Sequence, residues 1–202
     1  MKLYYSPGAC SLSPHIVLHE SGLAFEAVLA STKTHKLKDG TDYYTINSKG
    51  YVPLLELDDG QRLTEGPAIV QYIADLVPAK NLAPAAGTMA RYRVMEWLNF
   101  ISTELHKTFS PLFTPNMPDD AKAMFRERLL ERFKWVDGQL EGKTFVTGDT
   151  FTVADAYLFV VTNWGQYVGV DVSGLAHLQA FMARVGARPA VQAALKAEGL
   201  LK

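Results

Sequence analysis

The sequence is short of cysteine, of net charge and of long hydrophobic runs, and each shortage excludes a class of protein. With one cysteine in 202 residues the chain has no internal disulfide, which fits a reducing compartment. The net charge is −1 and no block of like charge occurs, so the sequence has no basic region that would bind nucleic acid or an anionic membrane. No apolar run approaches the ~18 residues that span a bilayer, and the first residues lack the apolar core of a signal peptide. We therefore expect a cytoplasmic protein that binds neither nucleic acid nor membrane.

The first 77 residues alternate between patterns typical of strands and of helices. Residues 2–6 and 25–30 have strand character, with a helix start at Ser11-Leu12-Ser13-Pro14 between them. Asp58-Asp59-Gly60 separates "VPLLEL" from "QRLT", which is a strong hairpin signal. "EGPAIVQYIADLV", residues 65–77, follows with apolar side chains at helical spacing. This order predicts an α/β domain in which helices pack on a mixed sheet.

The second half of the chain has a different character. Residues 77–87 contain two prolines and no periodicity, which is typical of a linker. Beyond them "MARYRVMEWLNFISTELHKTF", "DDAKAMFRERLLERFKWVDGQL" and "TVADAYLFVVTNWGQYV" all follow the helical period, and shorter helices are expected at about 175–186 and 189–197. We therefore predict two domains, a mixed one over residues 1–80 and an all-helical one over residues 88–202.

Thr152 and Asp155 have the spacing of a capping box, with Asp in place of the usual Glu and Phe151 where a hydrophobic staple would lie. A structural helix start is the best interpretation, so the Asp155 carboxylate is not a catalytic candidate. His15 and His19 have the i, i+4 spacing of a helical metal pair, but no third ligand accompanies them. The sequence therefore predicts no metal site.

The single cysteine lies in "YYSPGACSLSP", between the first strand and the first helix. A side-chain oxygen of this stretch is expected to cap the helix, and the N-terminal end of a helix favours a thiolate. The alternative is that Cys10 is a small buried hydrophobic residue. This stretch alone leaves both interpretations open.

Three stretches together carry a resemblance: "YYSPGACSLSPHIVLHESG", "NSKGYVPLLELDDGQRLTEGPAIVQYIAD" and "RYRVMEWLNFISTELHKTFSPLF". In this order, with "FTVADAYLF" late in the chain, the sequence resembles a bacterial glutathione S-transferase of the beta class from end to end. The resemblance implies a thioredoxin-like N-terminal domain, an all-α C-terminal domain and a homodimer. It also implies transfer of reduced glutathione to small hydrophobic electrophiles, with glutathione as co-substrate and no other cofactor.

The resemblance also implies which residues form the glutathione site. In the family the residue matching Cys10 points at the glutathione sulfur and forms a mixed disulfide with it, and Ser11 and His106 stabilise the thiolate. A cis bond before Pro53 leaves the Val52 backbone to pair with the cysteinyl unit of glutathione. The remaining glutathione-binding residues that it implies are His35, Glu65, Gly66, Asn99, Thr103, Glu104, His106 and Lys107. On the helical period Asn99, Thr103 and His106 share one stripe.

Three positions depart from the family pattern, and one of them is Ser48, which stands where proline is frequent. His35 stands where the family often has Lys, and it is the candidate for binding the glycine carboxylate of glutathione. Tyr51 stands where Gln is common and would enlarge an aromatic wall beside the thiol. The predicted pocket for the electrophile is lined by Tyr51, Phe109, Phe113, Trp164 and Tyr167, although most aromatic residues of the helical domain are expected to be core.

Two other functions remain open from the sequence. Cys10-Ser11-Leu12-Ser13 has the C-x-x-S form of a monothiol glutaredoxin-like oxidoreductase. The long helical domain favours transfer, because an electrophile pocket needs it and a redox domain does not. A non-catalytic protein that binds glutathione or a hydrophobic ligand is the third interpretation. The sequence does not identify the electrophile, nor does it rank conjugation against dehalogenation, peroxidase activity or disulfide reduction.

Overall fold

The structure is a computed structural model that describes residues 1–201, and the chain divides into two compact units. Unit 1 comprises Met1–Ala83 together with the chain from Arg188 onward, and unit 2 comprises Pro84–Ala187. The predicted helical domain covers residues 88–202, whereas the last helix contacts the first one and belongs to unit 1. Among the described residues, no helix is both long and apolar enough to cross a membrane.

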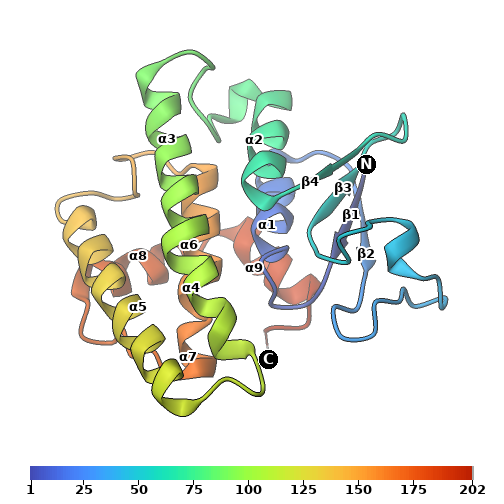
Figure 1. Cartoon of the computed structure of the whole chain (residues 1–202). Helices are drawn as coiled ribbons and strands as arrows, with labels where there is room; N and C mark the ends of the chain where they lie inside the picture. Colours follow the sequence, from blue (N-terminus) through green and yellow to red (C-terminus); the bar gives the residue numbers. More distant parts are fainter. Residues whose placement is uncertain (202) are drawn as a thin grey trace. The chain divides into compact units, whose positions relative to one another are not determined.

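Unit 1 is built on a four-stranded mixed sheet in the order β2-β1-β3-β4 (Figure 1). β1 (Lys2–Tyr5) pairs in parallel with β2 (Glu26–Leu29) and antiparallel with β3 (Leu54–Glu56), which pairs antiparallel with β4 (Arg62–Thr64). The β3–β4 connection is the predicted hairpin, in which Gly60 adopts a left-handed φ of 84°. The predicted mixed sheet of a thioredoxin-like domain is therefore confirmed.

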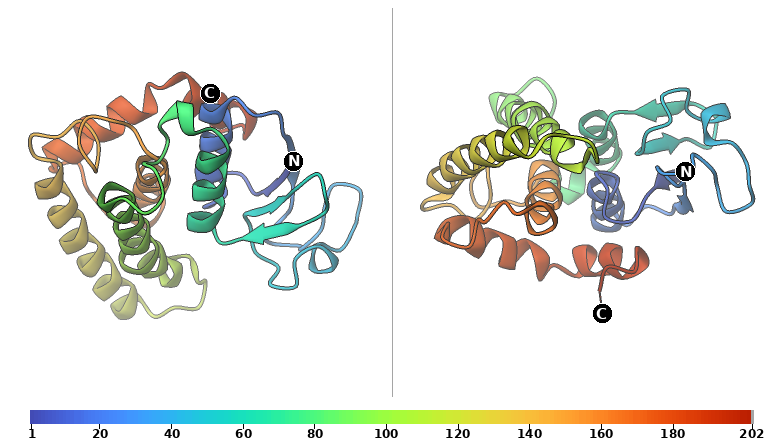
Figure 2. Two further views of the ribbon diagram at one scale, coloured as in Figure 1. Left: turned by 90° about the horizontal axis from the view of Figure 1, so that it is seen from above. Right: turned by 60° about the horizontal axis from the view of Figure 1, so that its bottom comes forward.

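Two helices, α1 (Leu12–Ser21) and α2 (Gly66–Leu76), contact each other and lie together on one side of the sheet (Figure 1). α1 ends at Gly22, whose left-handed φ of 74° lets its N–H donate to the Leu18 carbonyl. α9 (Pro189–Ala197) runs beside α1 (Figure 2). Arg188 secures it through two hydrogen bonds, of 2.6 and 3.0 Å, to the Glu20 carboxylate.

A core cluster of unit 1 lies against the sheet and is completed by the segment between β2 and β3. It contains Tyr4, Ala30, Tyr43, Val52 and Leu54. Tyr43 begins a short 3₁₀ turn, η1 (Tyr43–Thr45), and is almost fully buried, while its hydroxyl donates to the Tyr51 carbonyl at 3.0 Å. Burial raises the pKa of Tyr43 to about 12. One buried tyrosine thus anchors a long segment with little regular structure.

Unit 2 is helical throughout. Its long helices are α3 (Met89–Phe100), α5 (Asp119–Leu140), α6 (Val153–Asn163) and α8 (Ala176–Gly186), with short turns η4 (Ser110–Phe113) and α7 (Gly165–Val168). α6 is its central helix, because its residues from Val153 to Thr162 are all buried and it contacts both α3 and α8. The all-helical prediction for this part of the chain is confirmed.

One prediction for the first long helix is wrong. The α-helical period was applied through residue 109, but α3 passes into a π-helical segment, η3 (Ile101–His106), before α4 (Lys107–Phe109). The Lys107 N–H donates to the Ser102 carbonyl, an i→i−5 bond that widens the turn. Spacings of four and three residues therefore do not define one stripe across Asn99, Thr103 and His106. Such single wide turns are frequent at functional sites.

The capping box at the start of α6 is confirmed. The Asp155 carboxylate is completely buried and accepts hydrogen bonds from the Thr152 N–H at 2.7 Å, the Thr152 hydroxyl at 3.0 Å and the Val146 N–H at 2.8 Å. Burial nevertheless raises its pKa from the ordinary 3.8 to about 6. All three hydrogen bonds of this carboxylate connect the start of α6 to the loop that precedes it. The role of Asp155 is therefore structural.

Candidate active site

Cys10 lies in the loop between β1 and α1, just before the helix begins, as the sequence indicates. Its Sγ donates to the Val52 carbonyl oxygen at 3.3 Å, and its own carbonyl accepts the Ser13 N–H at 3.1 Å. The side chain is only partly buried. A partly exposed thiol at the N-terminal end of a helix has the setting in which cysteine becomes reactive.

Ser11 occupies the N-cap of α1 but does not cap it with its side chain, so the predicted capping interaction is wrong. Its hydroxyl instead donates to the Ser6 carbonyl at 3.2 Å and accepts the Ser6 N–H at 3.1 Å. The side chain is completely buried. Ser11 therefore closes the loop of residues 6–11 upon itself and holds the backbone next to Cys10.

The same loop is held from the far end of the chain by Glu198. One of its carboxylate oxygens accepts the Gly8 N–H at 2.9 Å, and the other pairs with Nδ1 of His15 at 2.8 Å. The Glu198 and His15 side chains are 0% and 1% exposed, so this hydrogen-bonded pair lies in the interior of unit 1. The His15 ring stacks on His19 at 5.1 Å, and burial lowers the pKa of His19. No group of three metal ligands occurs among residues 1–201.

The loop before β3 carries the second part of the candidate site. The Val52–Pro53 bond is cis, as the resemblance implies. Asn47 is buried and braces this loop, because its Nδ2 donates to the Tyr51 carbonyl at 2.7 Å while its Oδ1 accepts the Lys49 N–H at 3.2 Å. Gly50 has a φ of 68°, and a Cβ there would lie 2.5 Å from the Tyr44 ring. Only glycine fits this turn.

Glu65 directly precedes α2, with Gly66 as the first helical residue. Glu65 has a φ of 69°, a conformation that is strained for a residue with a Cβ and that is found mainly at functional sites. Its carboxylate accepts a 2.7 Å hydrogen bond from Nζ of Lys49. Lys49 was not among the predicted site residues, because nothing in the local pattern links positions 16 residues apart.

His35 also has a left-handed backbone, with a φ of 52°. Its ring stacks on Tyr44 at 4.6 Å and 30°. Nδ1 is buried and makes no hydrogen bond within the described part of the chain. The structure therefore fixes the orientation of this imidazole by stacking and leaves one ring nitrogen unpaired.

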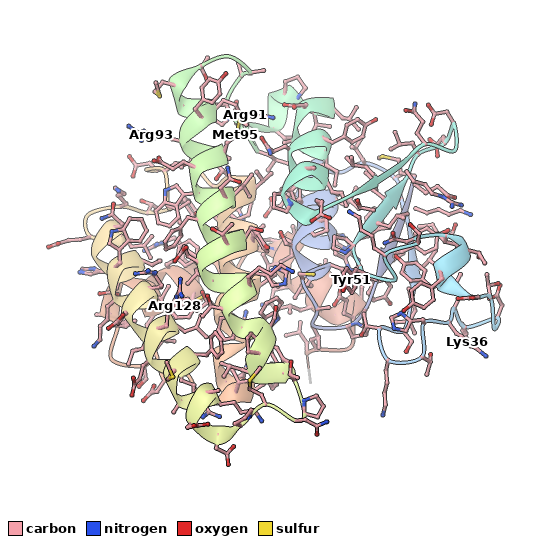
Figure 3. All side chains as sticks on the ribbon, in the orientation of Figure 1. Lys36, Tyr51, Arg91, Arg93, Met95 and Arg128 are labelled. Atoms are coloured by element: carbon pink, nitrogen blue, oxygen red, sulfur yellow. The ribbon has the colours of Figure 1, made fainter. Side chains whose placement is uncertain are left out.

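In unit 2 the predicted polar residues lie on and around the π-helical turn. Thr103 donates to the Asn99 carbonyl at 3.0 Å, and both residues are exposed, as is Lys107. Glu104 is paired with Arg132 at 2.9 Å and with Arg128 at 3.5 Å, and these hydrogen bonds lower the pKa of the Glu104 carboxyl. Arg128 extends from α5 (Figure 3).

His106 ends the π-helical turn and is fixed by aromatic neighbours. Its Nδ1 and the hydroxyl of Tyr157 share a hydrogen bond of 2.6 Å, and its ring meets Trp164 edge to face at 4.8 Å. Tyr157 and Trp164 are both buried, whereas His106 is half-buried. When the hydroxyl is the donor, the imidazole proton is on Nε2, the nitrogen turned away from Tyr157.

The predicted aromatic pocket residues differ widely in exposure. Phe109 is fully buried and Trp164 nearly so, while Phe113 is 50% exposed. These three rings contact one another with centroids 5.7 to 6.5 Å apart, so Phe109 supports the other two from beneath. Tyr167 in unit 2 and Tyr51 in unit 1 (labelled in Figure 3) are both about two-thirds exposed.

None of these aromatic residues lines a cavity of about 510 Å³ in unit 2. It is lined by residues of α6, α7 and the turn after Gly169, together with Gln179 and Met182 of α8. None of the predicted site residues contributes to it.

Comparison with known proteins identifies the family of the chain. Residues 8–76 match the family profile of the glutathione S-transferase N-terminal domain, and residues 100–189 match that of the C-terminal domain. Glutathione S-transferase GstA of Escherichia coli O157:H7 is 48% identical over 200 residues, which cover 99% of this chain and 100% of that protein.

Solved structures extend the likeness to three dimensions. The ternary complex of BphK, a bacterial glutathione S-transferase, is 58% identical with a TM-score of 0.97, covering 99% of this chain and 100% of that one. A sphingomonad glutathione S-transferase complexed with glutathione and the beta-class enzyme of Sphingomonas chungbukensis are each 48% identical with a TM-score of 0.96, and both alignments cover 100% of both chains. The chain therefore belongs to the glutathione S-transferase family and groups with its bacterial beta-class members.

Proposed function

We propose that the chain transfers reduced glutathione to small hydrophobic electrophiles. The observation that carries the proposal is the position of Cys10, whose thiol lies at the start of α1 in hydrogen-bond contact with the carbonyl of Val52. Val52 is the residue whose backbone, before a cis proline, would pair with the cysteinyl unit of glutathione. A bound glutathione sulfur would then lie next to the only thiol of the chain.

The ends of glutathione are assigned to the two other fixed elements of unit 1. Glu65 and the backbone of Gly66, at the start of α2, would take the γ-glutamyl head, because a carboxylate suits its ammonium and a helix N-terminus suits its carboxylate. His35 would take the glycine carboxylate. Asn99, Thr103, Glu104, His106 and Lys107 keep the glutathione-binding role that the family resemblance implies.

Two kinds of chemistry follow from a glutathione thiolate beside Cys10. In transfer, the thiolate sulfur forms a bond to an electrophilic carbon, the leaving group departs with its electron pair, and the thiol proton passes to solvent. In disulfide reduction, the Cys10 thiolate attacks the glutathione sulfur of a mixed disulfide between glutathione and another thiol. Cys10 becomes disulfide-bonded to glutathione, and the other thiol leaves as its thiolate. A second glutathione thiolate then releases Cys10 and restores the enzyme.

We expect turnover of glutathione with 1-chloro-2,4-dinitrobenzene, followed by the absorbance of the conjugate. In Cys10→Ala, reduction of a glutathione mixed disulfide should fall by at least about 100-fold, since the nucleophile of that reaction is gone. Cys10→Ser should behave in the same way. Full activity of Cys10→Ala on every electrophile and disulfide tried would make the cysteine structural. Glutathione binding without turnover by the wild-type protein would contradict the proposed function and favour a binding protein.

The KM for glutathione is expected to rise between pH 6 and 8 if His35 binds the glycine carboxylate. A histidine loses its positive charge in this range, and with it the attraction for an anion. In His35→Lys the cation persists, so the KM should remain level across the same interval and lie several-fold lower at pH 8. A flat wild-type profile, measured by initial rates at saturating electrophile, would remove His35 from the site.

The resemblance carries two further expectations. We expect a homodimer, which sedimentation equilibrium can test. We also expect the protein to act in the cytoplasm, where glutathione keeps thiols reduced.

A further inference from the structure

Lys49 is the one lysine that the structure places on the candidate γ-glutamyl site, among residues 1–201. Its Nζ donates to Oε1 of Glu65 at 2.7 Å and to Oγ1 of Thr64 at 3.1 Å. Both contacts are with the turn that leads from β4 into α2. The carboxylate expected to receive the ammonium group of glutathione therefore already has a cationic partner.

The backbone that carries Lys49 is held in place on both sides. Its N–H donates to the buried side chain of Asn47, and the next residue, Gly50, is confined by the Tyr44 ring. Three residues after Lys49 the same loop reaches Val52 and the cis bond. Lys49 and the backbone proposed to bind the cysteinyl unit thus belong to one loop that these contacts hold.

The side chains of the ion pair are, by contrast, accessible. Lys49 is 49% exposed and Glu65 is 70% exposed. An ion pair this open contributes little to stability and can exchange partners at small cost. A ligand can therefore reach both charges without unfolding the loop.

The opposite charges of Lys49 and Glu65 determine which ligands bind favourably here. An amine alone would compete with Lys49 for Glu65 and would leave the lysine without its partner. An α-amino acid head brings a carboxylate as well, so the two ion pairs can exchange: ligand ammonium to Glu65 and ligand carboxylate to Lys49. Two opposite charges at fixed positions favour a zwitterion over either single charge.

We propose that Lys49 binds the α-carboxylate of the γ-glutamyl group and makes the site selective for a zwitterionic head. The proposal rests on glutathione being the substrate. The ammonium of the ligand replaces Nζ at Oε1 of Glu65, and the freed Nζ turns to the carboxylate beside the N–H of Gly66. No bond to carbon or sulfur changes in this step.

The test compares two ligands on the full-length protein by isothermal titration calorimetry. One is glutathione, and the other is γ-aminobutyryl-cysteinyl-glycine, which keeps the amine but lacks the α-carboxylate. In Lys49→Met the Kd for glutathione should rise about fivefold, while the Kd for the analogue stays the same or falls. Lys49→Arg should bind glutathione nearly as the wild type does, because it keeps the cation. Lys80→Met, a change of another exposed lysine of unit 1, is the control and should alter neither Kd.

The outcomes separate the two proposals. If the wild type binds glutathione and Lys49→Met binds it equally well, or loses affinity for both ligands by the same factor, Lys49 does not bind the carboxylate and only this inference is overturned. If the wild type gives no heat with glutathione, the proposed function is overturned and this inference with it. An unchanged urea midpoint in Lys49→Met establishes that the variant is folded.

Discussion

At pH 7, replacement of Asp155 by alanine is expected to lower the free energy of unfolding by about 3 kcal/mol. The carboxylate is the acceptor for the N–H groups of Thr152 and Val146, and alanine leaves both donors unpaired next to the buried helix α6. An unpaired buried donor costs the full desolvation of that group. Urea unfolding followed by circular dichroism measures the change. Asp149→Ala removes an exposed carboxylate of the same loop and should change stability by less than about 0.5 kcal/mol.

The cost of Asp155→Ala should also depend on pH. The pKa of Asp155 is about 6 in the folded protein and 3.8 ordinarily, so between these values the folded state holds a proton that the unfolded state has released. Protonation of this group therefore adds most to wild-type stability below about pH 4, and this added part is lost as the pH rises through 6, while the hydrogen bonds remain. Between pH 7 and pH 4.5 the stability difference from Asp155→Ala should widen by about 2 kcal/mol. A constant difference would show that the carboxyl titrates normally.

The elements that could be predicted from the sequence are those that local chemistry determines. The Asp58-Asp59-Gly60 hairpin needs only a glycine that accepts a left-handed turn between two apolar segments. Helix α5, over 119–140, follows from an unbroken apolar period. The capping box before α6 depends on two residues three positions apart. In each case the determining interactions lie within a few residues of one another.

The features that could not be predicted depend on wide turns or on distant partners. A period of 3.6 residues cannot anticipate the π-helical turn at 101–106, where the bond pattern shifts by one residue. A side-chain oxygen of residues 11–14 was expected to cap α1, but the hydroxyl of Ser11, the N-cap residue, instead bonds to Ser6, which offers it both a donor and an acceptor. The exposure of Phe109 and Tyr167 is set by packing, so aromatic character alone does not separate pocket from core.

Glu198, which binds the loop that carries Cys10, could not be predicted from the sequence either, because it is far from that loop along the chain. Glu198 lies 190 residues from Gly8, and its role appears only when α9 packs against α1. A glutamate near the end of a chain has no pattern that marks it as buried. Once buried, however, a carboxylate needs charged or hydrogen-bonding partners, and His15 and Gly8 supply them.

Glu198→Ala is therefore expected to lower the free energy of unfolding by about 3 kcal/mol, since it removes one partner of a fully buried hydrogen-bonded pair and leaves the other without it. It also deprives the Gly8 N–H of its acceptor, which loosens the loop that carries Cys10. Glu198→Gln keeps the shape and one carbonyl oxygen, so its cost should be smaller. Glu26→Gln, a change of an exposed glutamate of the same unit, is the matched control.

Alkylation by iodoacetamide distinguishes a purely global loss of stability from an effect on the loop. Cys10 is the only thiol in the chain, so every alkylation event reports on this one residue. Under conditions where more than nine-tenths of Glu198→Ala is folded, Cys10 should react about tenfold faster than in the wild type, because opening of the loop releases the thiol from the Val52 carbonyl. A destabilised variant with an unchanged alkylation rate would mean that Glu198 secures α9 without holding the loop. An unchanged free energy of unfolding would mean that the Glu198–His15 pair contributes nothing to stability. It would also contradict the inference that Glu198 holds the loop that carries Cys10.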